Sequence, residues 1–267
     1  MSKSSRALVL VALLVLGGAG ACQSRESVDV EETQQKSLVT SLEERYRKEP
    51  GAVYSQLSSA LFRLGLIHYR KGEFEKAALE FERSAEVSSK GRGSHSASDY
   101  VWPAQCYLKL EKYDQAERYL NLARPLEEKN MSGGISPAMV SILDGLGLVY
   151  EKTGRTKEAE QIYREAAEKV EAREADLVQC ISSPQAFDAL AQFLERQGRL
   201  EEAEKWYKQV AGLRVISHAQ QAQGESILNY AGMLKRQKRG REAAAMERNG
   251  RQIVEAVKRR NEKGLDY

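Results

Sequence analysis

The sequence has few of the residues that build metal and catalytic centres. Only three histidines and three cysteines occur among 267 residues. The histidines, His68, His95 and His218, do not stand at metal-ligand spacing, and no H-E-x-x-H, C-x-x-C, Walker or G-x-G-x-x-G string is present. No nucleophile is paired with a base by any motif. These absences predict that the protein is not an enzyme and that it holds no metal and no cofactor.

An excess of positive charge is also missing. The 41 Lys and Arg nearly balance the 38 Asp and Glu, so the formal net charge is +3. Nucleic-acid binding needs a concentrated basic face, and we therefore expect no nucleic-acid partner. One local basic cluster favours either a solvated terminal helix or a contact with an anionic partner or headgroup; its residues are Lys235, Arg236, Lys238, Arg239 and Arg241.

Long hydrophobic runs are absent as well. The uncharged apolar run Ala7–Leu16 has ten residues, whereas a membrane-spanning helix needs about 20. Lys3 and Arg6 precede this run and small residues follow it, which is the pattern of a secretory signal. We expect residues 1–21 to be removed as a signal peptide, which leaves a formal charge of +1 because Lys3 and Arg6 are lost. A retained membrane anchor is the alternative.

The string that ends this segment, Ala19-Gly20-Ala21-Cys22, resembles the lipobox of bacterial lipoproteins. The resemblance implies that Cys22 becomes the first mature residue and is acylated, and several acyl chains make a durable anchor. Gln23 follows the cysteine, as in lipoproteins sorted to the outer membrane. The implied location is the bacterial outer membrane, lipid-anchored and facing the periplasm. An ordinary secreted protein, cleaved nearby, is the alternative.

The rest of the chain contains a regular spacing of small residues. Five times, glycine or alanine is followed twelve positions later by alanine: Gly65/Ala77, Ala104/Ala116, Gly147/Ala159, Ala191/Ala203 and Ala231/Ala243. Small residues let two helices approach closely, and a constant spacing fixes where they cross. The pattern predicts a stack of helix–turn–helix units.

The residues around each pair resemble the tetratricopeptide repeat. The third unit reads Leu143, Leu146, Gly147, Tyr150, Gly154, Ala159, Tyr163 and Ala166. Successive units lie 39 to 44 residues apart, longer than the usual repeat of about 34, as in kinesin light chains and their bacterial relatives. The resemblance implies an all-α fold, a right-handed α-solenoid of about five repeats.

The expected organisation follows from these patterns. Residues 22–36 are polar and acidic and predict a flexible tether, 37–55 an N-terminal capping helix, 56–260 the solenoid and 261–267 a C-terminal tail. Cys106 falls inside the first helix of the second unit and Cys180 before the fourth. Stacked units place them too far apart for a disulfide, so we expect a small core residue at Cys106 and a free thiol at Cys180.

In tetratricopeptide stacks the first helix of each unit lines a concave groove. The resemblance therefore implies a partner-binding groove formed by Phe62, Leu66, Tyr69, Arg70, Gln105, Leu108, Leu148, Glu151, Lys152, Gln192, Glu195 and Arg196. The same register adds Val101, Asp144, Asp188, Leu228, Lys235 and Arg236. Apolar and charged residues in one groove suit a peptide or a partner helix. The alternative for Phe62, Leu66 and Leu148 is packing against the preceding helix.

These features predict a membrane-anchored scaffold that binds other proteins or peptides in the bacterial envelope. One alternative is an assembly factor, similar to a pilotin, for a pilus or a secretion system. A second alternative is a periplasmic enzyme whose site has no recognisable motif.

Overall fold

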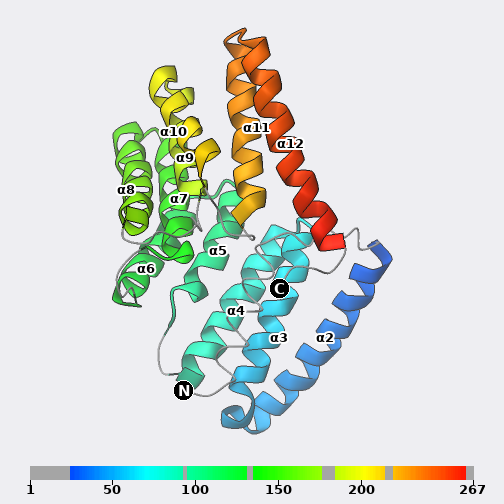
Figure 1. Cartoon of the computed structure of the whole chain (residues 1–267). Coiled ribbons are helices and arrows are strands. Elements are labelled where there is room, and N and C mark those ends of the chain that lie inside the picture. The colour runs from blue at the N-terminus through cyan, green and yellow to red at the C-terminus, as the bar shows by residue number, and fades with distance from the viewer. Residues whose placement is uncertain (1–24, 93–94, 131–134, 176–183, 214–218, 263–267) are drawn as a thin grey trace. The chain divides into compact units, whose positions relative to one another are not determined.

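The computed structural model describes residues 25–92, 95–130, 135–175, 184–213 and 219–262. These residues form α-helices and no strands (Figure 1). The helices are α2 (Arg25–Lys48), α3 (Pro50–Arg70), α4 (Phe74–Arg92), α5 (Ser98–Lys109), α6 (Tyr113–Asn130), α7 (Pro137–Lys152), α8 (Thr156–Ala175), α9 (Gln185–Arg196), α10 (Leu200–Gly212), α11 (Gln220–Arg236) and α12 (Gly240–Glu262). The predicted signal peptide over residues 1–21, Cys22 and Cys180 lie outside the described residues.

After α2, the helices in the described part of the chain follow one another as five pairs, each joined by a short turn. The prediction of about five helix–turn–helix units is confirmed. The chain divides into two compact units, residues 23–162 and residues 163 onward, with the boundary inside α8. In the first unit α3 lies along α4, and in the second α11 lies along α12 (Figure 1).

The turn between the two helices of a pair is the same in all five pairs. Its central residue has a positive φ, between 57° and 79°, and always stands seven positions after the small residue of the first helix: Gly72, Glu111, Gly154, Gly198 and Lys238. The N–H of this residue donates to the carbonyl three residues back, at 2.9–3.2 Å. The next N–H donates to the carbonyl five residues back, at 2.8–3.0 Å. These two bonds are the Schellman motif, which satisfies the last carbonyls of a helix.

The same turn explains the constant spacing of twelve. The alanine of the second helix lies five residues after the left-handed residue, and its N–H donates at 2.9–3.0 Å to the residue that follows the left-handed one. That bond belongs to the first turn of the second helix. The left-handed residue comes seven positions after the small residue of the first helix, and the alanine comes five positions after that. The two small residues are therefore always twelve positions apart. All five alanines of the second helices are at most 1% exposed.

Glycine supplies the left-handed conformation in three of the turns, and a charged residue supplies it in the other two. Glu111 has φ 57° and Lys238 has φ 61°. A side chain in this region costs about 1–2 kcal/mol because Cβ crowds the following carbonyl oxygen. Tertiary packing and the two hydrogen bonds of the motif therefore impose this conformation on sequences that do not favour it.

The core of the first unit is made of the small residues and the aromatic rings beside them. A Cβ placed on Gly65 would lie 2.8 Å from the ring of Phe81, so a glycine lets α3 lie directly against α4. The ring of Phe81 packs against Phe62 and Trp102, with centroids 5.3 and 5.2 Å away. Cys106 is buried and has a free thiol, and burial raises the pKa of that thiol to about 12. It is a core residue, as the sequence predicted.

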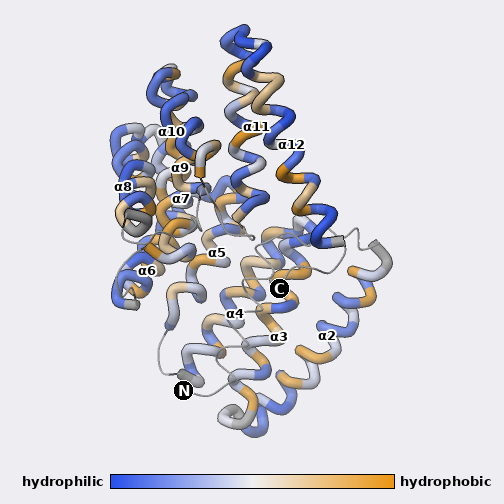
Figure 2. Tube along the Cα trace, viewed as in Figure 1, coloured by the Kyte–Doolittle hydropathy of each residue, from blue (hydrophilic) through white to orange (hydrophobic). Residues whose placement is uncertain are grey.

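In the second unit the last pair has a second close approach that the repeat pattern did not indicate. A Cβ on Gly250 of α12 would lie 2.9 Å from the carbonyl oxygen of Gly224 on α11. A Cβ on Gly224 would meet Val254 at 2.8 Å. Backbone therefore approaches backbone at this end of the pair. Figure 2 shows hydrophilic residues along much of α12, with hydrophobic ones at intervals.

The predicted flexible tether over residues 22–36 is wrong for residues 25–36, because these residues form the first half of α2. The predicted capping segment 37–55 is divided between α2 and α3. Val39 and Leu42 of α2 are 4% and 5% exposed and pack on Leu57 and Leu61 of α3. Toward its beginning α2 is held by Lys71, whose ammonium lies 2.6 Å from both Asp29 and Glu32. The acidic composition of this segment predicted a solvated, flexible chain. In the structure its acidic side chains instead form ion pairs with Arg70 and Lys71, where α3 ends. The predicted tail at 261–267 begins inside α12, which ends at Glu262.

No helix among the described residues combines the length and the apolar character that crossing a membrane requires.

Substitutions in the turn should change stability in opposite directions. We expect Glu111→Gly to raise the free energy of unfolding by about 1 kcal/mol, since it removes the strain of a left-handed side chain. Gly154→Ala, at φ 79°, should lower it by about 1 kcal/mol or more. Urea denaturation followed by circular dichroism measures both. Glu158→Gly, at an exposed helical position of α8, is the control and should be destabilising. Loss of stability in Glu111→Gly would contradict the strain argument.

A second prediction concerns Glu204 on α10, whose carboxylate accepts hydrogen bonds from Arg239 at 2.5 and 3.0 Å and from Tyr230 at 3.1 Å. The Arg239 hydrogen bonds lower the pKa of Glu204 from 4.5 to about 2. Because the pKa falls on folding, the carboxylate stabilises the fold fully above pH 4.5 and the stabilisation is lost as the pH falls toward 2. Glu204→Gln should lower the free energy of unfolding by about 1–2 kcal/mol at pH 7.

The difference between wild type and Glu204→Gln should shrink steadily between pH 4.5 and pH 2, measured by denaturation at each pH. Glu201→Gln, at an exposed glutamate of the same helix, is the matched control and should have little effect at any pH. A pH-independent difference would rule out the ion pair as its cause.

Candidate binding groove

The second unit contains a cavity of about 690 Å³ formed by α9, α10 and α11. We call this cavity the α9–α11 groove. Its apolar lining comes from Leu200, Tyr207, Leu228 and Met233. The polar and charged lining comes from Gln192, Glu195, Arg196, Asn229, Arg236 and Gln237, and Gly232 completes it. Arg196, Asn229 and Arg236 are exposed, so polar groups surround an apolar centre.

Tyr207 anchors the deep side of the groove. Its side chain is 1% exposed and its ring stacks on Tyr230, with centroids 5.5 Å apart and planes 13° apart. Burial raises the pKa of Tyr207, so the hydroxyl stays protonated and donates to Glu195 Oε2 at 3.2 Å. Met233 beside it is fully buried. These contacts make a rigid apolar surface with one hydroxyl at its edge.

Glu195 also connects the two first helices across the groove. Arg236 of α11 donates from Nε to Glu195 Oε1 of α9 at 3.0 Å, and a second guanidinium nitrogen lies 2.5 Å away. The Arg236 side chain is 66% exposed, so solvent screens this pair and it can exchange for another anion. The same acid therefore orients a buried tyrosine and an exposed arginine.

Asp188 of α9 holds the polar side of the groove together. Its carboxylate accepts hydrogen bonds from Ser226 Oγ at 2.8 Å, Asn229 Nδ2 at 3.1 Å and Gln192 Nε2 at 2.7 Å. Burial raises the pKa of Asp188, and the three hydrogen bonds oppose that shift. Ser226 and Asn229 belong to α11, so this one carboxylate joins α9 to α11. It also fixes the orientation of Gln192 and Asn229, which line the groove.

Most of the basic cluster predicted from the sequence pairs with acids of the same unit. Lys235 lies 2.6 Å from Glu247, Arg236 pairs with Glu195, and Arg239 binds both Glu204 and Glu242. The pairing leaves little unbalanced positive charge, which favours the solvated terminal helix over an anionic partner.

The twelve groove residues predicted from the sequence fall into different surroundings. Gln192, Glu195 and Arg196 line the α9–α11 groove together. In the first unit Phe62 and Tyr69 are half-buried and pack, with the buried Leu66, in the cluster around Phe81 and Trp102. Packing, the alternative given above for Phe62 and Leu66, accounts for both residues.

The other six predicted residues, all in the first unit, do not belong to the lining of the α9–α11 groove. Arg70 donates to Glu31 of α2 at 3.1 Å, and Gln105 donates to Ser141 of α7 at 3.1 Å. Leu108 is half-buried and packs against the core of α5, α6 and α7. Leu148 and Glu151 are half-buried and Lys152 is exposed, all on α7.

The sequence reading missed most of the apolar lining of the groove. Tyr207 and Leu200 belong to the second helix of the fourth unit, and the repeat pattern places such residues in the core. Tyr207 stands four positions after Ala203, where the pattern requires an aromatic residue. Tyr207 is buried and also belongs to the lining of the groove, so a position four after the alanine is a signal for the floor of such a site.

One other cluster of potential ligands was missed. Glu32, His68 and Glu73 come together in the first unit, and each offers an atom suited to a metal ion. Among the described residues, these three are the group of His, Cys, Asp or Glu side chains whose ligand atoms lie close enough together to hold a metal ion. No metal-binding motif includes these three residues, because Glu32 lies 36 positions before His68. Glu32 also belongs to the segment that the sequence predicted to be a tether.

Comparison with known proteins agrees with this architecture. Three family models described as tetratricopeptide repeat match residues 52–93, 102–172 and 186–217. The matches cover α3 and α4, most of α5 to α8, and α9 and α10. The chain therefore has the fold of an all-α solenoid of tetratricopeptide repeats. No curated protein matches the sequence.

Several solved structures are similar in fold. BtubC from P. vanneervenii is 16% identical with a TM-score of 0.64, and the alignment covers 87% of this chain and 92% of that one. A putative kinesin light chain from Podosopora anserina with TPR-like repeats is 15% identical with a TM-score of 0.55, covering 78% and 94%. The quorum sensor NprR from B. thuringiensis is 16% identical with a TM-score of 0.55, covering 88% and 67%. The similarity to long kinesin-light-chain repeats agrees with the spacing found in the sequence.

The role of Asp188 leads to a third prediction. Asp188→Ala removes the acceptor of three hydrogen bonds and leaves the hydroxyl of Ser226, which is 1% exposed, without this partner. We expect the free energy of unfolding to fall by about 1–3 kcal/mol. Compared with the wild type, hydrogen exchange in this variant should become faster at residues 226–229 of α11 and stay unchanged in α3. Glu225→Ala, at the exposed neighbour on α11, serves as the control. Unchanged exchange in α11 would show that Asp188 does not join the two helices.

Proposed function

We propose that this protein is an envelope scaffold that binds a peptide segment of a partner protein in the α9–α11 groove. The single observation that carries the proposal is the arrangement of an apolar floor inside a ring of polar and charged groups. Such a site buries one or two apolar side chains of a peptide and uses a few polar groups to fix its orientation. No catalytic step is assigned to the protein.

The hydrogen bonds of the groove indicate what the peptide meets there. Gln192 and Asn229 use their amide nitrogens to bind Asp188, so their amide oxygens are left to accept hydrogen bonds. Backbone N–H groups of an extended segment are suitable donors. Arg236 can exchange its exposed pair with Glu195 for an acidic side chain of the partner, at little cost in water. The expected ligand is an extended segment with a Leu-like anchor and a nearby acid.

A protein of similar fold supports peptide binding as a use of this fold. NprR has been crystallised in complex with its cognate peptide NprX, and that structure has a TM-score of 0.50 and 14% identity to this chain. At this identity only the fold is shared, so the residues that bind must be argued from the groove itself. The apolar floor and the oriented amides are that argument.

We further propose that acylated Cys22 anchors the scaffold to the outer membrane, facing the periplasm. The support is the segment Ala19-Gly20-Ala21-Cys22 after a charged and apolar start, followed by Gln23. Anchoring would concentrate the groove at a membrane surface where its partners reside. Replacing Cys22 with serine tests it: the protein should lose its acyl mass and leave the membrane fraction. The lipoprotein hypothesis is overturned if the variant fractionates like the wild type and the two proteins show no difference in acyl mass.

Peptide binding gives the fourth prediction. Peptides are first selected from an array with the wild-type protein, and affinities are then measured by calorimetry. Leu200→Glu puts a charge into the apolar floor, and a glutamate at the first position of α10 suits a helix N-terminus. We expect this variant to bind at least about tenfold more weakly, as one lost apolar anchor costs about 1.4 kcal/mol or more.

The matched control is Leu122→Glu, the same change at a 42% exposed leucine of α6. It should bind like the wild type. Equal affinity in all three proteins would place the peptide elsewhere, and failure to select any peptide would contradict the proposed scaffold function. Melting curves of both variants confirm that each is folded before binding is compared.

A further inference from the structure

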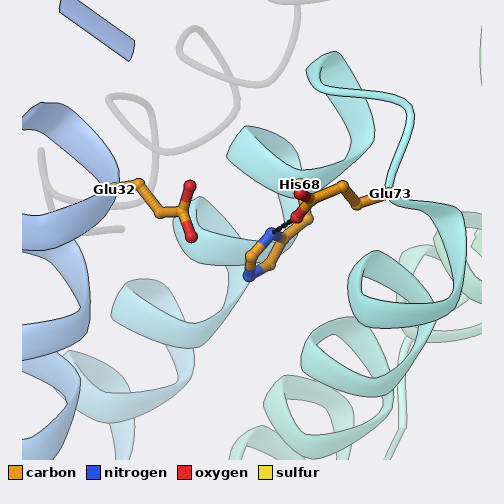
Figure 3. Close-up of side chains that lie close together, drawn as sticks. All are labelled: Glu32, His68 and Glu73. Atoms are coloured by element: carbon orange, nitrogen blue, oxygen red, sulfur yellow. Dashed lines mark hydrogen bonds and ion pairs between the residues drawn. The ribbon is translucent and has the colours of Figure 1, made fainter. Parts of the chain in front are cut away.

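Three ionisable side chains converge where α2 meets the turn between α3 and α4. Glu32 comes from α2, His68 from the last turn of α3, and Glu73 directly follows the left-handed Gly72. One potential ligand atom from each lies within 4.8 Å of the others. Figure 3 shows the imidazole lying between the two carboxylates, with its ring close to Glu73 and its open side toward Glu32. We call Glu32, His68 and Glu73 the α2–α3 cluster.

The imidazole of this cluster is buried and oriented before any ligand arrives. His68 is 3% exposed, and its Nδ1 donates to Glu73 Oε2 at 2.7 Å. The backbone reinforces this contact, because the N–H of Glu73 donates to the carbonyl of His68 at 2.9 Å as part of the Schellman motif. A carboxylate on one ring nitrogen is the usual way to orient a histidine whose other nitrogen binds a metal. Nε2 is the nitrogen left for that purpose.

Both carboxylates are ionised at neutral pH. Glu32 is 9% exposed and lies 2.5 Å from Lys36 and 2.6 Å from Lys71, and these hydrogen bonds lower the pKa of Glu32 to about 2. Lys76, and to a smaller degree His68, lower the pKa of Glu73. An ionised carboxylate can bind a cation without first losing a proton, so the cluster needs no acid–base change to act as a ligand set.

The lysines now on Glu32 can move away without being left unpaired. Lys36 is 54% exposed, so its ammonium can turn into water. Lys71 has a second partner, Asp29, at 2.6 Å. Moving both lysines away from Glu32 therefore leaves neither ammonium buried without a partner. Burying an unpaired charge would be the main energetic cost of such an exchange.

We infer that the α2–α3 cluster binds one divalent transition-metal ion, with Glu32 and His68 Nε2 as its protein ligands and Glu73 holding the imidazole from Nδ1. Imidazole together with carboxylate is a donor set suited to zinc, cobalt or nickel rather than to magnesium or calcium. Zinc binds these donors at about 2.0–2.2 Å, so two ligand atoms of a tetrahedral ion lie about 3.4 Å apart. Rotation of the Glu32 side chain adjusts its distance to the imidazole, whose ligand atom lies within 4.8 Å of the carboxylate. Water molecules complete the site.

A metal here would join α2 to the first helix pair. Glu32 is the ligand on α2, and His68 is the ligand in the last turn of α3. The ion would replace salt bridges that are partly exposed with coordinate bonds. The cluster is in the first unit and its residues line no part of the α9–α11 groove, so the inference is independent of the proposed peptide binding.

Calorimetry and thermal unfolding of the full-length chain test the inference, with ZnCl2 as the probe and MgCl2 in parallel. We expect zinc to bind with one equivalent and to raise the melting temperature, and magnesium to do neither at the same concentration. Bound cobalt should show the intense visible absorption of a low-coordinate site. His68→Gln and Glu32→Gln should each weaken zinc binding at least tenfold.

His95→Gln is the matched control, because His95 also lies beside an acid, with Nδ1 3.9 Å from Asp99, but outside any such cluster. It should keep the zinc affinity of the wild type. Glu32→Gln changes a residue of α2 alone, so it keeps the test valid if His68→Gln fails to fold. The inference is overturned if zinc does not bind with one equivalent, or if Glu32→Gln binds it as tightly as the wild type. Loss of binding in His95→Gln, with none in Glu32→Gln, would also overturn it.

Discussion

The left-handed turn between the two helices of a pair is the constraint on which the rest of the structure depends. Two hydrogen bonds of the Schellman motif close the first helix, and the next residue already accepts the first bond of the second helix. The path from one helix to the next therefore has no adjustable length. It forces the small residues of the pair to the same relative positions each time, and Gly65 against the Phe81 ring shows how close the helices then come.

The strength of this constraint is clearest where the sequence does not favour it. Glu111 and Lys238 adopt the conformation that glycine adopts elsewhere. Burial of the two helices beside each turn offsets the free-energy cost of this strain. Their small residues Ala104, Ala116, Ala231 and Ala243 are at most 2% exposed. A turn that is locally unfavourable is thus stabilised by contacts that only the folded pair can make. Local and global preferences agree in three pairs and conflict in two.

Repetition of the pair also explains how a groove arises without a motif for it. First helices of the fourth and fifth pairs, α9 and α11, are linked by Asp188, Ser226 and Asn229. The linking residues orient polar groups, and the aromatic residue demanded by the repeat, Tyr207, provides the floor. In the first unit aromatic rings occupy the corresponding helices, where Phe62 and Tyr69 of α3 both pack against Trp102 of α5. The same scaffold is therefore closed by aromatic rings in one place and left open in another.

The sequence by itself determined the helix pairs and that there are about five of them, because the spacing of small residues that marks each pair spans only twelve positions. It also indicated Gln192, Glu195 and Arg196 of the groove through their register on a first helix. Only the tertiary structure decided which first-helix residues are covered, since rings from other helices bury Leu66 and cover part of Phe62. Only it decided that residues 25–36 are helical, because Asp29 and Glu32 find Lys71 some forty residues away. The meeting of Glu32 with His68 has the same origin: periodicity records which face a residue occupies, and packing between distant segments decides what that face meets.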